Sequence, residues 1–153
     1  MTKLVPAAFA IAVALLALAA CGGDGDETTA ALTKAEFIAQ GDEICEQGDK
    51  AGEARLEEFA EENGIDLENP TKEQQEEAVT EVFAASLDSQ AEGLRDLGTP
   101  EGDEGEVDEI LGALESAVEE LEDEPNLLFE EKATGLNEAA ALAGEYGFES
   151  CGS

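Results

Sequence analysis

The sequence predicts an all-α fold, an antiparallel four-helix bundle that follows a cleaved leader and a flexible linker. Apolar residues recur at helical spacing in four segments between residues 33 and 148, and no strand-length run alternates with a period of two. Two of these segments open with capping-box patterns, which mark helix starts. Because the connections between the segments are short, we expect the four helices to pack against one another as antiparallel neighbours.

The first helix is expected to begin at Thr33, where Thr33-Lys34-Ala35-Glu36 forms a capping box, and to end at Asn63-Gly64. One face of this helix carries apolar and small residues, and its glycines are expected to let another helix approach closely. The residues of that face are Phe37, Gly41, Ile44, Cys45, Gly48, Gly52, Leu56 and Phe59.

The second helix is expected to begin at Thr71, where Gln74 completes another capping box, and to stop at the Gly98-Thr99-Pro100 break. Gln90 is a polar residue within its apolar face, and it indicates either a bundle end or a polar contact. The apolar face comprises Val79, Val82, Phe83, Leu87, Leu94 and Leu97.

A third helix is expected from about Asp103 to the residues before Pro125, and a fourth from there to Tyr146. The fourth helix is expected to carry Leu128, Lys132, Leu136, Ala139, Ala140, Ala143 and Tyr146 on one face. Gly147 fits the left-handed position after that helix, so Phe148 is expected to fold back onto its last turn.

Residues 1–20 have the parts of a secretory signal peptide: Lys3, an apolar stretch from Leu4 to Ala17, and small residues at the end. The apolar stretch is shorter than the roughly twenty residues that a transmembrane helix needs. Leu18-Ala19-Ala20-Cys21 resembles the lipobox of bacterial lipoproteins. The resemblance implies cleavage before Cys21, a diacylglycerol on its sulfur, and a fatty acyl group such as palmitate on the new amine.

Three regions follow from this interpretation: a lipoprotein signal peptide at 1–20, the lipidated Cys21 with a flexible acidic linker at 21–32, and a helical bundle domain at 33–153. Lipidation of Cys21 leaves two cysteines that can pair. In an up-down-up-down bundle, the start of the first helix and the end of the fourth share one pole. We therefore predict a Cys45–Cys151 disulfide, which persists in an extracytoplasmic compartment.

Alternative roles for these two cysteines are weaker. Redox-active pairs are usually close in sequence, as in Cys-x-x-Cys, whereas Cys45 and Cys151 are far apart. Two cysteines without any histidine also fail to supply the usual ligands of a zinc site.

The charge of the chain narrows the classes of partner. All 39 acidic residues follow residue 20, while Lys and Arg together number 7 in the whole chain. Nucleic-acid binding requires a basic surface, so that class is excluded, and the charge also opposes docking on an anionic membrane. A solvated exterior, salt adaptation and a cation-binding surface all remain open as explanations of the acidity.

The sequence offers little for catalysis or for a dedicated metal site. It has no histidine, no Gly-x-Ser-x-Gly motif and no phosphate-binding loop, so we expect no enzyme and no cofactor. Acidic clusters at Asp24–Glu27 and Glu101–Glu106 lack the ligand spacing of an EF-hand. We therefore assign no catalytic, cofactor-binding or metal-binding residues.

A further resemblance covers nearly the whole chain after residue 20. The lipobox is followed by an acidic linker, an early Phe-x7-Cys from Phe37 to Cys45, a Thr-Pro break, and a closing Tyr-Gly-Phe-x-x-Cys from Tyr146 to Cys151. This combination resembles small lipoproteins of actinobacterial type. The resemblance implies an envelope location and a disulfide-tied helical domain, and it carries no activity with it.

The sequence thus predicts a non-enzymatic protein of the cell envelope, held on the extracytoplasmic face of the membrane by the lipid on Cys21. Its leading predicted role is to present an acidic helical domain to a basic envelope protein, a wall component or weakly bound divalent cations. The alternative is a ligand- or cation-binding accessory module of envelope transport or sensing.

Overall fold

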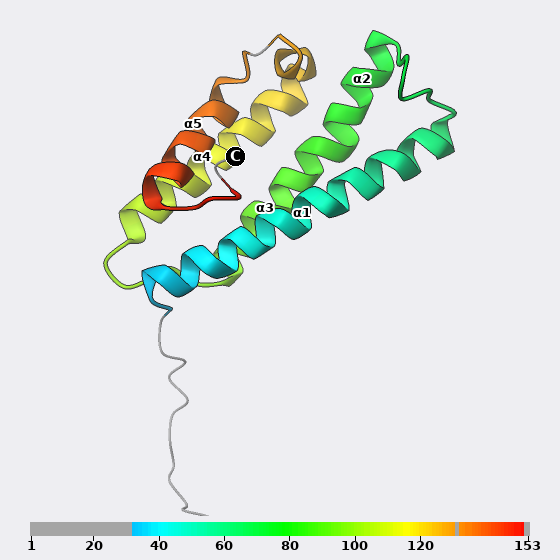
Figure 1. Ribbon diagram of the computed structural model, residues 1–153. Coiled ribbons are helices and arrows are strands. Elements are labelled where there is room, and N and C mark those ends of the chain that lie inside the picture. The colour runs from blue at the N-terminus through cyan, green and yellow to red at the C-terminus, as the bar shows by residue number, and fades with distance from the viewer. Residues whose placement is uncertain (1–31, 131, 152–153) are drawn as a thin grey trace, which may run out of the picture.

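The computed structural model describes residues 32–130 and 132–151, and these residues form an all-helical domain (Figure 1). The predicted signal peptide, Cys21 and nearly all of the predicted linker lie outside the described residues. The elements are α1 (Lys34–Asn63), α2 (Lys72–Ala78), the π-helical segment η1 (Val79–Ala84), α3 (Ala85–Asp96), α4 (Glu104–Asp123), the 3₁₀ turn η2 (Pro125–Leu128) and α5 (Thr134–Tyr146). No helix among these residues is both long enough and apolar enough to span a membrane.

The predicted helix ends of α1 are confirmed. The hydroxyl of Thr33 accepts a hydrogen bond from the Glu36 N–H, and the Glu36 carboxylate accepts one from the Thr33 N–H at 3.0 Å. At the other end, Gly64 adopts φ 64°, and its N–H donates to carbonyls of the last turn of the helix. This left-handed conformation favours glycine and stops the helix.

The second predicted helix is one continuous helical segment made of α2, η1 and α3. Thr71 and Gln74 form the predicted capping box, with a distance of 2.9 Å from the Thr71 N–H to the Gln74 carboxamide oxygen. The π-helical segment η1 was not predicted. Within it, the Thr80 hydroxyl donates to the Glu76 carbonyl at 3.1 Å.

The fourth helix begins later than expected. The prediction placed Leu128 and Lys132 on it, but Leu128 lies in η2 and Lys132 in the connection to α5. The start of α5 is fixed from α4, because the Glu120 carboxylate accepts hydrogen bonds from the Gly135 N–H at 3.0 Å and the Thr134 hydroxyl at 2.9 Å. These bonds hold the pKa of Glu120 below its ordinary value. A cap supplied by another helix is a tertiary interaction that local patterns do not contain.

Two apolar clusters hold the helices together. The first joins the start of α1, α3, α4 and the end of α5 around Phe37, Leu94, Val107, Tyr146 and Phe148. The second lies between η1, α3 and α4 beneath η2, and comprises Val79, Ala84, Leu87, Leu121 and Ala133. Helix α1 packs mainly against α3, while α4 packs against α3 and α5. In its second half, α1 diverges from α4 and α5, whereas α2 and η1 stay in contact with η2 (Figure 1).

Helices α4 and α5 approach each other closely at Gly135, so substitution of that glycine tests their packing. A methyl group there would lie 2.9 Å from the backbone nitrogen and Cα of Ala117. We expect Gly135→Ala to lower the free energy of unfolding by about 1–3 kcal/mol, because backbone cannot yield as a side chain does. Gly144→Ala, also in α5, meets open space and should instead stabilise by about 0.5–1 kcal/mol. Urea unfolding of both variants measures the two changes in the free energy of unfolding. Equal changes in the two variants would contradict the close packing of α4 and α5 at Gly135.

The surroundings of Tyr146 lead us to expect that the free energy of unfolding falls at alkaline pH. Its hydroxyl donates to the Asp103 carboxylate at 2.7 Å, and the Lys34 ammonium lies 3.7 Å from its ring centroid. Burial, and then the bond to Asp103, raise the pKa of Tyr146 above its ordinary value of 10.0. The stabilisation that the neutral phenol provides is therefore complete below pH 10 and is lost as the pH rises toward the pKa of the folded state.

Urea unfolding of wild type and Tyr146→Phe between pH 8 and pH 11.5 isolates this contribution. We expect the free energy of unfolding of wild type to fall more steeply above about pH 10 than that of the variant. If the free energies of unfolding of the two proteins changed in parallel over the whole pH range, the contribution of Tyr146 would be contradicted.

Candidate functional site

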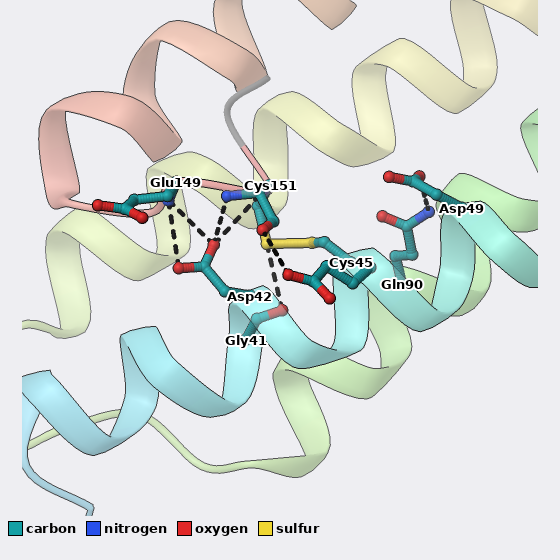
Figure 2. Close-up of a disulfide and its surroundings, with 9 residues drawn as sticks. Gly41, Asp42, Cys45, Asp49, Gln90, Glu149 and Cys151 are labelled. Atoms are coloured by element: carbon teal, nitrogen blue, oxygen red, sulfur yellow. Dashed lines mark hydrogen bonds between the residues drawn. A yellow bond between two sulfur atoms is a disulfide. The ribbon is translucent and has the colours of Figure 1, made fainter.

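The structure joins Cys45 of α1 to Cys151 of the C-terminal tail in the predicted disulfide (Figure 2). The sulfur atoms are 2.09 Å apart and the Cα atoms 5.3 Å apart. The preceding residues bring the tail to α1: Gly147 turns the chain with φ 122°, and the Phe148 N–H donates to the Ala143 carbonyl at 3.0 Å. The ring of Phe148 packs on Phe37 and Tyr146, as the sequence predicted for a residue folded back on the last turn.

Asp42 is a second attachment point for the tail, and no sequence pattern had indicated it. Its carboxylate accepts hydrogen bonds from three consecutive backbone N–H groups (Figure 2). The distances to Oδ1 are 3.0 Å from Glu149, 2.7 Å from Ser150 and 3.4 Å from Cys151. Asp42 lies one turn before Cys45 on the same helix, a spacing that could have indicated it once the disulfide was assumed.

Glycines of α1 allow α3 and the tail to lie against it, which confirms their predicted role. A methyl group at Gly41 would lie 2.4 Å from the ring of Phe148. One at Gly48 would lie 2.5 Å from Cγ of Gln90. The Gln90 side chain therefore packs against α1 at Gly48, in space that a larger residue at that position would occupy.

An apolar cleft of about 720 Å³ opens where the second half of α1 diverges from α4 and α5. One wall is the second half of α1 and the loop after it, the next is formed by α2, η1 and the first part of α3, and the third by η2 and α5. Along α1 the cleft runs from Cys45 to Phe59, about 21 Å of helix at 1.5 Å per residue. Its principal apolar side chains are Leu56, Phe59, Val82, Phe83, Leu128 and Leu136.

The two ends of the cleft differ. One end, here called the closed end, is lined by the disulfide and by the buried side chains of Leu94 and Ala143. At the other end Leu67 and Phe129 form part of its lining, and they are 48% and 50% exposed. These are the exposed large hydrophobic side chains of the described residues. Their position at the cleft gives it an apolar entrance.

Polar groups gather near the closed end. Gln90 is only 8% exposed, and its Nε2 donates to the Asp49 carboxylate at 3.4 Å (Figure 2). The Ser86 hydroxyl donates to the Gly48 carbonyl at 3.2 Å. Glu53, one helical turn beyond Asp49, is the other charged residue of the lining. Among the described residues no lysine or arginine lines the cleft.

The residues singled out from sequence are distributed unevenly around this site. Cys45, Cys151 and Gln90 meet at its closed end, and Leu136 lies on its wall. Lys132 lies away from it and pairs with Glu130 at 2.7 Å. Within residues 32–130 and 132–151, no group of three or more acidic or cysteine side chains is arranged to hold a metal ion. Neither a protein-family model nor a curated protein nor a solved structure matches the chain.

Proposed function

We propose that this protein is a lipid-anchored, non-enzymatic protein of the cell envelope whose helical domain binds an apolar small molecule in the cleft. The cleft is the observation that carries the proposal. Small-molecule sites typically occupy about 300–1,000 Å³, are mainly apolar, and contain a few placed polar groups. The cleft, with its volume of about 720 Å³ and its Gln90, Ser86 and Asp49, has each of these properties.

The helix arrangement supports the same proposal. We propose an antiparallel four-helix bundle that is closed at the pole of the disulfide and opened at the opposite pole. Helices of such bundles commonly enclose ligand sites between them. The disulfide and the first apolar cluster keep the closed pole together, so that the divergent pole can hold a ligand without loss of the whole fold.

The acidic surface favours a small ligand over a second copy of the chain. Each chain carries 39 acidic residues. If two copies met through their clefts, two strongly negative domains would come together, and the repulsion between like charges opposes this association. A small apolar molecule carries no such penalty. The cleft therefore favours the ligand-binding alternative over a role confined to the acidic exterior.

Binding of a neutral apolar fluorophore tests the proposal. We expect N-phenyl-1-naphthylamine to bind the chain from residue 21 onward saturably, with one equivalent per chain and a blue-shifted, enhanced emission. The experiment uses no substitution and no reducing agent, so the disulfide and the closed end of the cleft remain as in the structure. Emission that rises linearly without saturation, or that matches buffer alone, would refute binding in the cleft.

The anchor is tested separately. We propose that the lipid on Cys21 holds the acidic domain at the membrane, since the charge of the chain offers no attraction to an anionic leaflet. Cys21→Ser should abolish lipidation and the cleavage before residue 21, and should change the membrane association of the protein accordingly. Cys151→Ser is the control and should remain membrane-associated. Unchanged processing and association of Cys21→Ser would refute the anchor.

A further inference from the structure

The charged residues that line the cleft indicate the chemical class of the ligand in the proposed function. The cleft combines apolar walls with two carboxylates, those of Asp49 and Glu53, and no basic side chain of the described residues lines it. Both carboxylates belong to exposed residues of α1, one turn apart. A charged group that enters between the walls at this position therefore meets negative charge only.

The position of the carboxylates along the cleft places the polar end of a ligand. Asp49 is one turn from Cys45, at the closed end, whereas the exposed Leu67 and Phe129 lie at the entrance. A ligand with an apolar body can lie along Leu56, Phe59 and Leu136 while its polar end reaches Asp49. The buried Gln90 carboxamide adds hydrogen-bonding capacity there, because its bond to Asp49 uses one of its two N–H groups.

The two carboxylates determine which sign of charge is favoured at the polar end of the ligand. A cation a few ångströms from these exposed carboxylates is favoured by a modest Coulomb attraction, and an anion at the same place is disfavoured by a similar amount. We propose that the cleft binds cationic amphiphiles, molecules with a long apolar body and an ammonium-type group held between Asp49 and Glu53. This inference rests on the proposed function, since it assumes that the cleft holds an apolar ligand.

Three dodecyl compounds that differ only at the polar end test the inference: dodecylammonium, dodecanol and dodecanoate, each below its critical micelle concentration. Displacement of bound N-phenyl-1-naphthylamine from the chain beginning at residue 21 gives their relative affinities. We expect dodecylammonium to bind at least about tenfold more tightly than dodecanoate, with dodecanol between them.

Charge on the whole protein could produce a preference of the same sign, so a matched pair of variants is needed. Asp49→Asn/Glu53→Gln removes two charges from the cleft, and Glu58→Gln/Glu62→Gln removes two from exposed positions of α1 that do not line it. We expect the preference for dodecylammonium to fall to about twofold in the first variant and to stay near tenfold in the second.

The outcomes separate the two proposals. If the fluorophore binds but the three dodecyl compounds compete equally, the cationic class is overturned while the cleft remains an apolar site. If both double variants lose the preference to the same extent, the selection comes from the overall charge and the inference is also overturned. If neither the fluorophore nor any dodecyl compound binds saturably, the proposed function itself fails.

Discussion

Replacing both Cys45 and Cys151 by serine is expected to lower the free energy of unfolding by about 4–5 kcal/mol. The disulfide closes a loop with a sequence separation of 106, and a loop of about a hundred residues loses a correspondingly large conformational entropy in the unfolded chain. A small domain has about 5–15 kcal/mol of total stability, so the loss takes a large share of it. Urea unfolding followed by circular dichroism measures the change.

The matched control is Cys21→Ser, which removes a cysteine outside the disulfide and should unfold like wild type. A reducing agent should destabilise wild type to the level of the double variant and leave the double variant unaffected. The hydrogen bonds from the tail to Asp42 remain possible in the reduced protein, so the tail is expected to stay near α1 in the folded state. Identical unfolding curves for oxidised and reduced wild type would contradict a stabilising disulfide.

Filling the cleft is expected to abolish binding of the apolar fluorophore. Ala140 lies in α5 on the wall of the cleft and is partly buried, so the indole introduced by Ala140→Trp would occupy space that the ligand needs. We expect the affinity of this variant for N-phenyl-1-naphthylamine to fall by at least about a hundredfold, because a fully blocked site forfeits the burial of the ligand's apolar surface.

Ala141→Trp provides a control at the next position of the same helix. Ala141 is exposed and does not line the cleft, so its variant should bind the fluorophore like wild type. The chain contains no tryptophan, and each variant therefore gains a single reporter. Indole emission of the Ala140→Trp variant should be blue-shifted relative to that of the Ala141→Trp variant if the first indole lies between the helices. Equal loss of binding in the two variants would point to damage to α5 rather than to a blocked site.

Local sequence signals predicted the starts of the first two helices because the causes of those starts are local, and they predicted the disulfide because the order of the helices brings the two cysteines together. Thr33 and Thr71 cap their helices through residues three positions away, and such pairs are visible in the sequence itself. Pairing of Cys45 with Cys151 needed only the order of four helices and the tail that follows Tyr146. The predicted start of α5 was wrong, because it depends on the Glu120 carboxylate of another helix.

The cleft could not be predicted from the same signals. Leu56, Phe59 and Leu136 have the helical spacing of core residues, and a helical stripe does not reveal whether a partner helix covers it. In the structure these residues are only partly buried, because α1 diverges from α5 beyond the disulfide. The π-helical segment η1 contributes Val79, Val82 and Phe83 to the same wall, and such segments frequently occur at functional sites.

Gln90 shows how an ambiguous sequence signal became specific. A polar residue within an apolar stripe indicated either a bundle end or a polar contact. The structure places it in contact with α1, where Gly48 makes room for it and Asp49 accepts its hydrogen bond. The cleft consequently has a defined polar position at the end closed by the disulfide.

Ligand binding in the cleft is tested most directly by methyl NMR of the isotopically labelled chain from residue 21 onward, titrated with N-phenyl-1-naphthylamine. We expect saturable shift changes and ligand contacts at the methyl groups of Leu56, Val82, Leu128 and Leu136, which line the cleft. Leu142, on the outer α4–α5 face, should remain unshifted. Contacts confined to Leu142 and its neighbours, or the absence of saturable shifts at the cleft methyls, would contradict the assignment of the cleft as a ligand site.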